Sequence, residues 1–211
     1  MYFDELRKGM TVEISPAVIE KEKMLAGELY DPSDALLVSQ RQMAHSLCRQ
    51  YNNLDETDEE RNLILKKLFG ENIAKGVYLQ GPVFFDYGVN TQIGENTYAN
   101  FNFTVLDCAP VNIGKNVFFG PNVAIYTPLH PLRWQERNMF TKSDGSLANL
   151  EYAKPISIGD NCWIAGNVTI CAGVTIGEGS VIGAGSVVVR DIPSGVVAVG
   201  NPCKVLKKIM E

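Results

Sequence analysis

The sequence predicts an all-β solenoid, a chain that coils in short extended sides, and three observations predict it. Aliphatic residues recur every six positions across residues 156–189, a period that fits neither an amphipathic helix nor a half-buried strand. The residues two positions before them share their face and are small or aliphatic, as a narrow interior requires. Glycine follows three of the aliphatic positions, where a chain that turns a corner benefits from lacking a Cβ. The recurring residues are Ile158, Ile164, Ile170, Ile176, Ile182 and Val188.

Composition limits the chain to one domain with at most a small appendage. Its 211 residues are 45% hydrophobic, and the formal net charge of −5 argues against a nucleic-acid surface that covers the protein but leaves room for a local basic patch. No apolar run approaches the roughly 20 residues that span a membrane, and residues 1–15 lack the apolar core of a signal peptide. The five cysteines are scattered without close pairs, so we expect reduced thiols. These features favour a cytoplasmic enzyme without nucleic-acid or membrane partners.

Three helices are expected before the coil. The first covers Glu20 to Leu29, because the following Asp-Pro pair disfavours helix. The second begins after Ser33 as N-cap and runs towards Asn52. The third begins at Thr57, which forms a capping-box pattern with Glu60, and ends near Gly70. The chain thus divides into an N-terminal extension with a short alternating run, a helical segment, the coil and a C-terminal tail, at residues 1–17, 18–72, 73–202 and 203–211.

The coil is expected to start near Val77 and to contain one large interruption. The six-residue phase holds through Val105, slips by two residues between Asp107 and Val111, and resumes up to Ile125. It then stops over residues 126–155, which carry charged, aromatic and glycine residues without a repeat. A loop of this length inside a compact fold is usually functional or disordered, so we predict an extruded loop.

This repeat resembles that of the hexapeptide-repeat acyltransferases, and the stretch from Glu22 to Tyr30 resembles the opening of their maltose and galactoside O-acetyltransferase subgroup. The resemblance implies a left-handed parallel β-helix with three six-residue sides per turn. It also implies a homotrimer with active sites between subunits, which transfers acetyl from acetyl-CoA to a hydroxyl of a sugar. Closed cyclic symmetry is the usual way in which such coils bury their flanks.

His130 is the predicted general base. It lies between prolines where the coil releases the long loop, and the resemblance assigns catalysis to a histidine followed by proline at this point. Imidazole can accept the proton of an attacking hydroxyl near neutral pH and contributes about 10²–10⁴-fold. Glu151 matches a glutamate that orients this histidine in some members, and the plain alternative is a surface carboxylate. His45, the only other histidine, is expected to be a partly exposed helix residue.

Further residues match the acceptor side of the family site. Asn100 is placed beside the reacting hydroxyl or the developing oxyanion, and its plain alternative is an asparagine that satisfies the backbone of a coil corner. Pro32 and Cys108 stand where a galactoside enzyme has aspartates, which suggests a different or broader sugar. The acceptor-binding residues implied by the resemblance are Arg41, Asp86, Tyr98, Asn100 and Asp107.

The resemblance also implies a coenzyme A path along the coil. Trp163 matches a tryptophan beside the pantetheine, and its plain alternative is subunit packing. The C-terminal lysines would bind the nucleotide phosphates through charge-assisted contacts, or would simply form a solvated helix face. Where the family has a Thr-Lys pair, this chain has Val189 and Arg190. The predicted cofactor-binding residues are Trp163, Gly166, Ala184, Val189, Arg190, Lys204 and Lys207.

Other functions remain open on the same coil. The acceptor could instead be serine, an amino sugar or an antibiotic, and a non-catalytic scaffold would lack coenzyme A binding. A zinc-dependent carbonic anhydrase needs three histidine ligands, whereas the coil supplies only His130, so no metal is expected. Residues Leu132–Leu150, with Trp134 and Phe140, could form a lid over the acceptor pocket.

Overall fold

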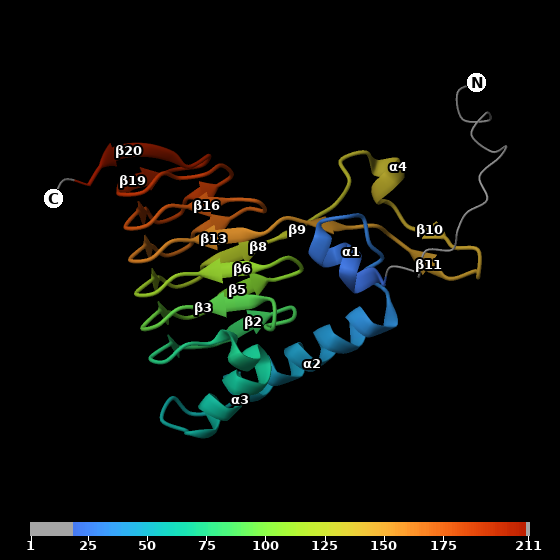
Figure 1. Ribbon diagram of the computed structural model, residues 1–211, viewed down its shortest axis with the longest axis horizontal. Coiled ribbons are helices and arrows are strands. Elements are labelled where there is room, and N and C mark those ends of the chain that lie inside the picture. Colours follow the sequence, from blue (N-terminus) through green and yellow to red (C-terminus); the bar gives the residue numbers. More distant parts are fainter. Residues whose placement is uncertain (1–18, 210–211) are drawn as a thin grey trace.

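The computed structural model describes residues 19–209, which form a parallel β-helix of about six turns, so the predicted fold class is confirmed. Figure 1 shows the turns stacked between a helical end and the C-terminal strands. The first side holds β1 (Tyr78–Leu79), β4 (Tyr98–Ala99), β7 (Phe118–Phe119), β14 (Trp163–Ile164), β17 (Val181–Ile182), β19 (Val196–Val199) and β20 (Lys204–Lys208). The second holds β2 (Val83–Phe85), β5 (Phe103–Leu106), β8 (Ala124–Tyr126), β15 (Thr169–Ile170) and β18 (Val187–Val188). The third holds β3 (Thr91–Ile93), β6 (Val111–Ile113), β13 (Ile156–Ile158) and β16 (Thr175–Ile176).

The six-residue repeat fills the inside of the coil. Each recurring aliphatic residue from Ile158 to Val188 is at most 2% exposed, and parallel pairing stacks it on its counterpart in the next turn, as Ile158 stacks on Ile113 and Ile176. The corner glycines matter because the next turn comes close. A Cβ on Gly159 would lie 2.6 Å from the backbone nitrogen of Glu178. This close approach keeps the corners narrow.

The helical segment covers one end of the coil. It contains α1 (Glu20–Ala26), α2 (Ala35–Asn52), α3 (Glu60–Phe69) and the 3₁₀ turn η2 (Gly70–Asn72). Helices α2 and α3 lie across the first turns, and their buried hydrophobic residues, except Leu37 of α2, join the same core as the coil interior. Arg61 is buried in this interface, where it donates to the carbonyl oxygens of Leu79 and Gln80 and to the Tyr51 hydroxyl. The first turn of the solenoid is therefore not left open to water.

Two predicted helix starts were wrong by one to three residues. The N-cap of α2 is Asp34 rather than Ser33, because the Asp34 carboxylate accepts from the backbone N–H groups of Leu36 and Leu37. Helix α3 begins at Glu60 rather than at Thr57, since Asp58 accepts from the Glu60 N–H and directs the chain into the helix there. The predicted run at Met10–Ile14, within the extension 1–17, lies outside the described residues.

The predicted loop 126–155 leaves the coil as a two-stranded stalk. The part of it without regular pairing to the stalk is therefore shorter than predicted. Strands β9 (Pro128–Leu129) and β12 (Tyr152–Ala153) pair antiparallel at its root. Beyond them the loop contains the short helix α4 (Trp134–Arg137) and the hairpin β10 (Phe140–Thr141) and β11 (Leu147–Ala148). Figure 1 shows this loop projecting from the coil on the same side as α1.

The C-terminal tail is a strand rather than a helix face. Strand β20 pairs antiparallel with β19, so that the chain folds back along the last side of the coil. All residues of β20 are exposed. None of the helices between residues 19 and 209 is both long and apolar enough to cross a membrane.

Candidate active site

A cavity of about 640 Å³ lies between the helical segment, the second side of the coil and the root of the long loop. We call it the main cavity. Pairing of β9 with β12 sets Leu129 opposite Tyr152, which brings the neighbouring His130 and Glu151 to the same wall. Four of the predicted site residues therefore meet here. They are His130, Glu151, Asp86 and Arg41.

His130 and Glu151 are close but not hydrogen-bonded. His130 Nε2 lies 3.9 Å from Glu151 Oε1, and the imidazole is 48% exposed. The other carboxylate oxygen accepts from the Tyr30 hydroxyl at 2.9 Å, and Tyr30 and Glu151 also exchange backbone hydrogen bonds. Burial raises the pKa of Tyr30, and neighbouring Cys108 and Glu151 add to the rise, so the hydroxyl stays protonated and donates. Glu151 is therefore held by Tyr30 through one carboxylate oxygen, and its other oxygen is the one nearest the His130 ring.

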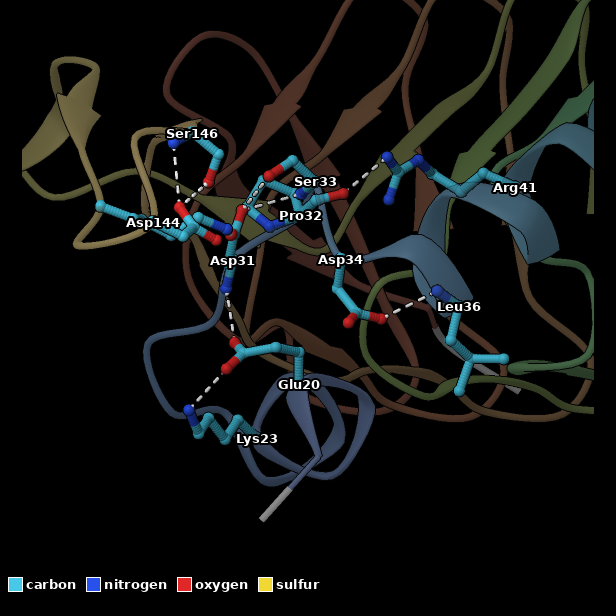
Figure 2. A network of polar contacts seen from close by, with 11 residues as sticks. Glu20, Lys23, Asp31, Pro32, Ser33, Asp34, Leu36, Arg41, Asp144 and Ser146 are labelled. Carbon is cyan, nitrogen blue, oxygen red and sulfur yellow. Dashed lines mark hydrogen bonds and ion pairs between the residues drawn. The ribbon is translucent and has the colours of Figure 1, made fainter. Parts of the chain in front are cut away.

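A polar network fixes the rim of the main cavity (Figure 2). Arg41 donates to the Tyr87 hydroxyl at 2.9 Å and to the carbonyl oxygen of Pro32 at 2.8 Å. Asp31 accepts from Lys142, on the hairpin of the long loop, at 2.8 Å. Its backbone N–H donates to Glu20 on α1 at 2.7 Å. These contacts thus link the loop hairpin to α1 and to the start of α2 beside the main cavity.

Asp86 projects from the outer face after β2 and has two partners. One carboxylate oxygen lies 3.3 Å from His45 Nε2, and the other accepts from the Cys108 thiol at 3.8 Å. Burial raises the pKa of the Cys108 thiol to about 12, so at neutral pH Cys108 is a neutral donor beside the carboxylate. His45 is exposed, as expected, but it also faces this carboxylate.

Asp107 does not reach the main cavity, which corrects its predicted role in contacting the acceptor. Its side chain is fully buried, and it accepts from the Tyr87 N–H at 2.7 Å and from the Thr91 hydroxyl at 3.0 Å. The two-residue slip in the repeat creates this internal position between β5 and β6. Asp107 supports Tyr87, which in turn holds Arg41.

Asn100, Tyr98 and Trp163 line a different hollow on the first side of the coil, with a volume of about 440 Å³. We call it the tryptophan cavity. Trp163 is 54% exposed and stands beside Phe118 in the parallel register. Asn100 Oδ1 accepts from the Phe101 N–H at 2.7 Å, which fixes the side chain and reserves its NH₂ group as a donor. Neither cavity shares a lining residue with the other.

Of the remaining predicted cofactor residues, Gly166, Ala184 and Lys207 lie along or just after strands of the first side of the coil, whereas Val189 and Arg190 follow β18 of the second side. The register of the paired strands aligns one outward-facing residue from each strand of the first side into a column, which ends at Lys207. The column spans about 24 Å, given strands about 4.8 Å apart. Ala184, Val189 and Arg190 are exposed at corners of later turns, and Gly166 packs against Pro121. The column is Tyr98, Phe118, Trp163, Val181, Val197 and Lys207.

Sequence reasoning missed several residues of the main cavity and its support. Tyr30 ends the stretch that carries the family resemblance, so its position was visible in the sequence, but its bond to Glu151 spans 121 residues. Asn149 lines the cavity from the returning limb of the loop, where no repeat gives a register. Contacts between segments so distant could be found only from the fold.

Two family models match the chain. Residues 23–71 match the maltose acetyltransferase hexapeptide capping motif, and residues 155–190 match six bacterial transferase hexapeptide repeats. These segments correspond to the helical end and to the later turns of the coil.

Relatives and solved structures agree with both models. The galactoside O-acetyltransferase of Escherichia coli is 39% identical over 189 residues, which are 89% of this chain and 88% of that protein. A maltose O-acetyltransferase structure from Clostridium difficile 630 superposes with a TM-score of 0.84 at 46% identity, covering 92% of this chain and 100% of that one. A galactoside acetyltransferase in complex with coenzyme A superposes with a TM-score of 0.82 at 37% identity, covering 92% of each chain.

Proposed function

The chain belongs to the maltose and galactoside group of the hexapeptide-repeat acetyltransferases, and on this premise we propose that it transfers acetyl from acetyl-CoA to a hydroxyl of a sugar. The observation that carries the proposal is that His130 lies 3.9 Å from a held carboxylate, Glu151, in a cavity lined by Arg41 and Asp86. Polar groups that converge in one hollow are what recognition of a hydroxylated acceptor requires.

In the proposed reaction His130 takes the hydroxyl proton as the sugar oxygen attacks the thioester carbonyl. Glu151 accepts the other ring N–H and stabilises the imidazolium. The same proton then passes to the departing thiolate of coenzyme A. Asn100 donates its amide N–H to the developing oxyanion. No acyl-enzyme forms, because neither Cys162 nor Cys171 is paired with a histidine within the described residues.

The outward column from Tyr98 to Lys207 supports a coenzyme A path along the first side of the coil. Exposed aromatic side chains suit the apolar pantetheine arm, and the cationic end of the column suits phosphates. Lys204 and Lys207 are both exposed on β20, so they can turn towards a bound nucleotide. This orientation places the thioester near the tryptophan cavity and the nucleotide near β20.

The separation of the two cavities supports a trimer with active sites between subunits. The proposed base lines one cavity and the proposed oxyanion donor lines another, on different sides of the coil. A neighbouring subunit in a closed ring would bring the tryptophan cavity of one chain to the main cavity of the next.

Thiol release from acetyl-CoA, measured with a panel of sugars, tests the function. We expect sugar-dependent turnover that His130→Ala lowers by about 10²–10⁴-fold with little change in coenzyme A affinity. His45→Ala is the matched control, since it removes the only other histidine, and it should keep turnover of monosaccharides. Equal losses in the two variants would contradict the assignment of the base. Turnover with serine or an amino sugar, but with no simple sugar, would overturn the acceptor class.

A further inference from the structure

Tyr30 lies where the helical segment meets the long loop. It follows α1, and it is only 1% exposed. Its ring belongs to a small buried cluster, separate from the core of the coil, that also contains Met24 of α1, Leu37 of α2 and Ala153 of β12. The packing of the ring is therefore shared by the helices and the root of the loop, and the hydroxyl is the one polar group of the side chain.

Two kinds of contact join Tyr30 to Glu151. The backbone N–H of each residue donates to the carbonyl oxygen of the other, at 2.9 and 3.1 Å, which forms an antiparallel bridge. The Tyr30 hydroxyl also donates to Glu151 Oε2 at 2.9 Å. The bridge fixes the backbone at Glu151, whereas the hydroxyl bond fixes the direction of its carboxylate. A substitution that removes only the hydroxyl therefore breaks the second contact and keeps the first.

The adjacent residue strengthens the same attachment. The Asp31 carboxylate accepts from Lys142 on the loop hairpin at 2.8 Å, and the Asp31 N–H donates to Glu20 on α1 at 2.7 Å. Residues 30 and 31 thus join α1 to both the hairpin and the returning limb of the loop. The helical segment therefore does more than cover the end of the coil, because it also holds the limb that carries Glu151.

Within residues 19–209, the Tyr30 hydroxyl is the one group that donates a hydrogen bond to the Glu151 carboxylate. The other carboxylate oxygen, Oε1, lies 3.9 Å from His130 Nε2. The terminal torsion of a glutamate has a broad preference, so a carboxylate without a fixed donor can turn away from the imidazole. Burial raises the pKa of Tyr30, which keeps the hydroxyl protonated as a donor.

We propose that Tyr30 is a positioning residue for the base, because it holds the Glu151 carboxylate in the direction of the His130 ring. The inference rests on the proposed acetyltransferase reaction, in which His130 takes the proton of the acceptor. Tyr30 does not line the main cavity, so it acts through Glu151 rather than on the acceptor. Loss of its hydroxyl should slow the chemical step without weakening the binding of either substrate.

A double-mutant cycle on kcat tests this role with Tyr30→Phe and Glu151→Ala. Tyr30→Phe keeps the buried ring and the backbone bridge. We expect it to lower kcat about tenfold, with the KM values for acetyl-CoA and for the sugar within about twofold of the wild type. Added to Glu151→Ala, it should change kcat less than about twofold, because the carboxylate through which the hydroxyl acts is gone. Equal losses in the two backgrounds would overturn the positioning role.

Tyr51→Phe is the matched control. It removes the hydroxyl of another tyrosine that is 2% exposed, which donates to the Leu79 carbonyl oxygen and accepts from Arg61 outside the main cavity. We expect Tyr51→Phe to lower stability towards denaturant while kcat and both KM values stay within about twofold. A fall in kcat as large as that of Tyr30→Phe would show that any lost buried hydroxyl loosens the site, and would overturn the inference.

Nuclear magnetic resonance of the histidine rings separates this inference from the reaction on which it rests. The chain has two histidines, so ring-labelled protein gives signals from His45 and His130, which His45→Ala tells apart. We expect the His130 signals to move in the same direction in Tyr30→Phe and in Glu151→Ala, and to stay in place in Tyr51→Phe.

Unchanged His130 signals in Tyr30→Phe overturn the positioning role even if the wild type acetylates sugars. Absence of turnover with every sugar in the wild type overturns the proposed function instead. The ring signals still decide in that case whether the Tyr30 hydroxyl sets the surroundings of His130.

Discussion

Asp107 is a charged residue in a place that disfavours charge. Its carboxylate is fully buried between β5 and β6, with one N–H donor and one hydroxyl donor for its two oxygens. Burial raises its pKa from 3.8 to about 6, although the hydrogen bonds from Tyr87 and Thr91 oppose the rise. A folded-state pKa above the unfolded value means that the folded protein binds the proton more tightly. Stability is therefore greatest below about pH 4 for this group, and it falls as pH rises through about 6.

We expect Asp107→Asn to remove this pH dependence. The amide can still accept from the Tyr87 N–H and donate to the Thr91 hydroxyl, so the packing is kept while the buried charge disappears. Relative to the wild type, the variant should gain on the order of 2–3 kcal/mol between pH 4 and pH 7, as the shift from 3.8 to about 6 implies. Denaturant unfolding at several pH values measures the gain. Parallel stability curves for the two proteins would show that the Asp107 pKa is not raised by folding.

Among the elements, the hairpin β10–β11 is attached to the helical segment through one ion pair. Lys142 Nζ lies 2.8 Å from Asp31 Oδ2, and the other carboxylate oxygen, Oδ1, accepts from the backbone N–H and the hydroxyl of Ser33. Burial alone would raise the pKa of Asp31, but hydrogen bonds from Lys142 and Ser33 outweigh it and lower the pKa. The pair is therefore intact at neutral pH and is lost only as the pH falls through that lowered pKa.

The position of this hairpin can be compared with the prediction that residues Leu132–Leu150 form a lid over the acceptor pocket. Trp134 and Phe140 are 61% and 42% exposed, so within one chain they do not close the main cavity. The part of the loop that lines it is the returning limb at Asn149 and Glu151. Within one chain the loop therefore shapes the rim of the main cavity, while these two aromatic side chains remain exposed.

Lys142→Met should loosen this rim without affecting the cofactor. We expect the KM for the sugar to rise about two- to fivefold, as for an exposed ion pair, with the KM for acetyl-CoA unchanged. Lys115→Met, which breaks another lysine–aspartate pair with an Nζ to Oδ2 distance of 3.6 Å, is the matched control and should change neither constant. Steady-state kinetics with each substrate varied in turn makes the comparison. A rise in both KM values would instead mean that the loop acts on the whole site.

At the scale of the whole molecule, the sequence is informative wherever a repeat imposes register. The six-residue period predicts the interior of the coil, because an added Cβ at a corner such as Gly159 would collide with the next turn. It cannot predict the Tyr30–Glu151 bond or the Asp31–Lys142 pair, since each joins segments separated by more than 100 residues with no common period. The predicted acceptor-binding role of Asp107 is wrong for a related reason. A motif match fixes only the position of a residue along the chain, whereas the two-residue slip in the repeat turns the Asp107 side chain towards the interior.

The last prediction concerns the assembly, because the proposed site needs parts of two chains. His130→Ala and Asn100→Ala should each be nearly inactive, with losses of about 10²–10⁴-fold and 10²–10³-fold respectively. If each site takes His130 from one subunit and Asn100 from its neighbour, random mixing of the two variants in equal amounts leaves roughly one quarter of the sites intact. Co-expression with two different tags, followed by double purification, isolates the hybrid trimers.

Recovered activity far above that of either parent, with each variant alone carried through the same steps as control, would establish a shared site. Hybrids that stay as inactive as their parents would show that both residues act within one chain. The main cavity and the tryptophan cavity would then have to approach each other by a movement within the subunit. Mass photometry of the same samples reports whether the hybrids are trimers, so that failed assembly is not mistaken for a site built from one chain.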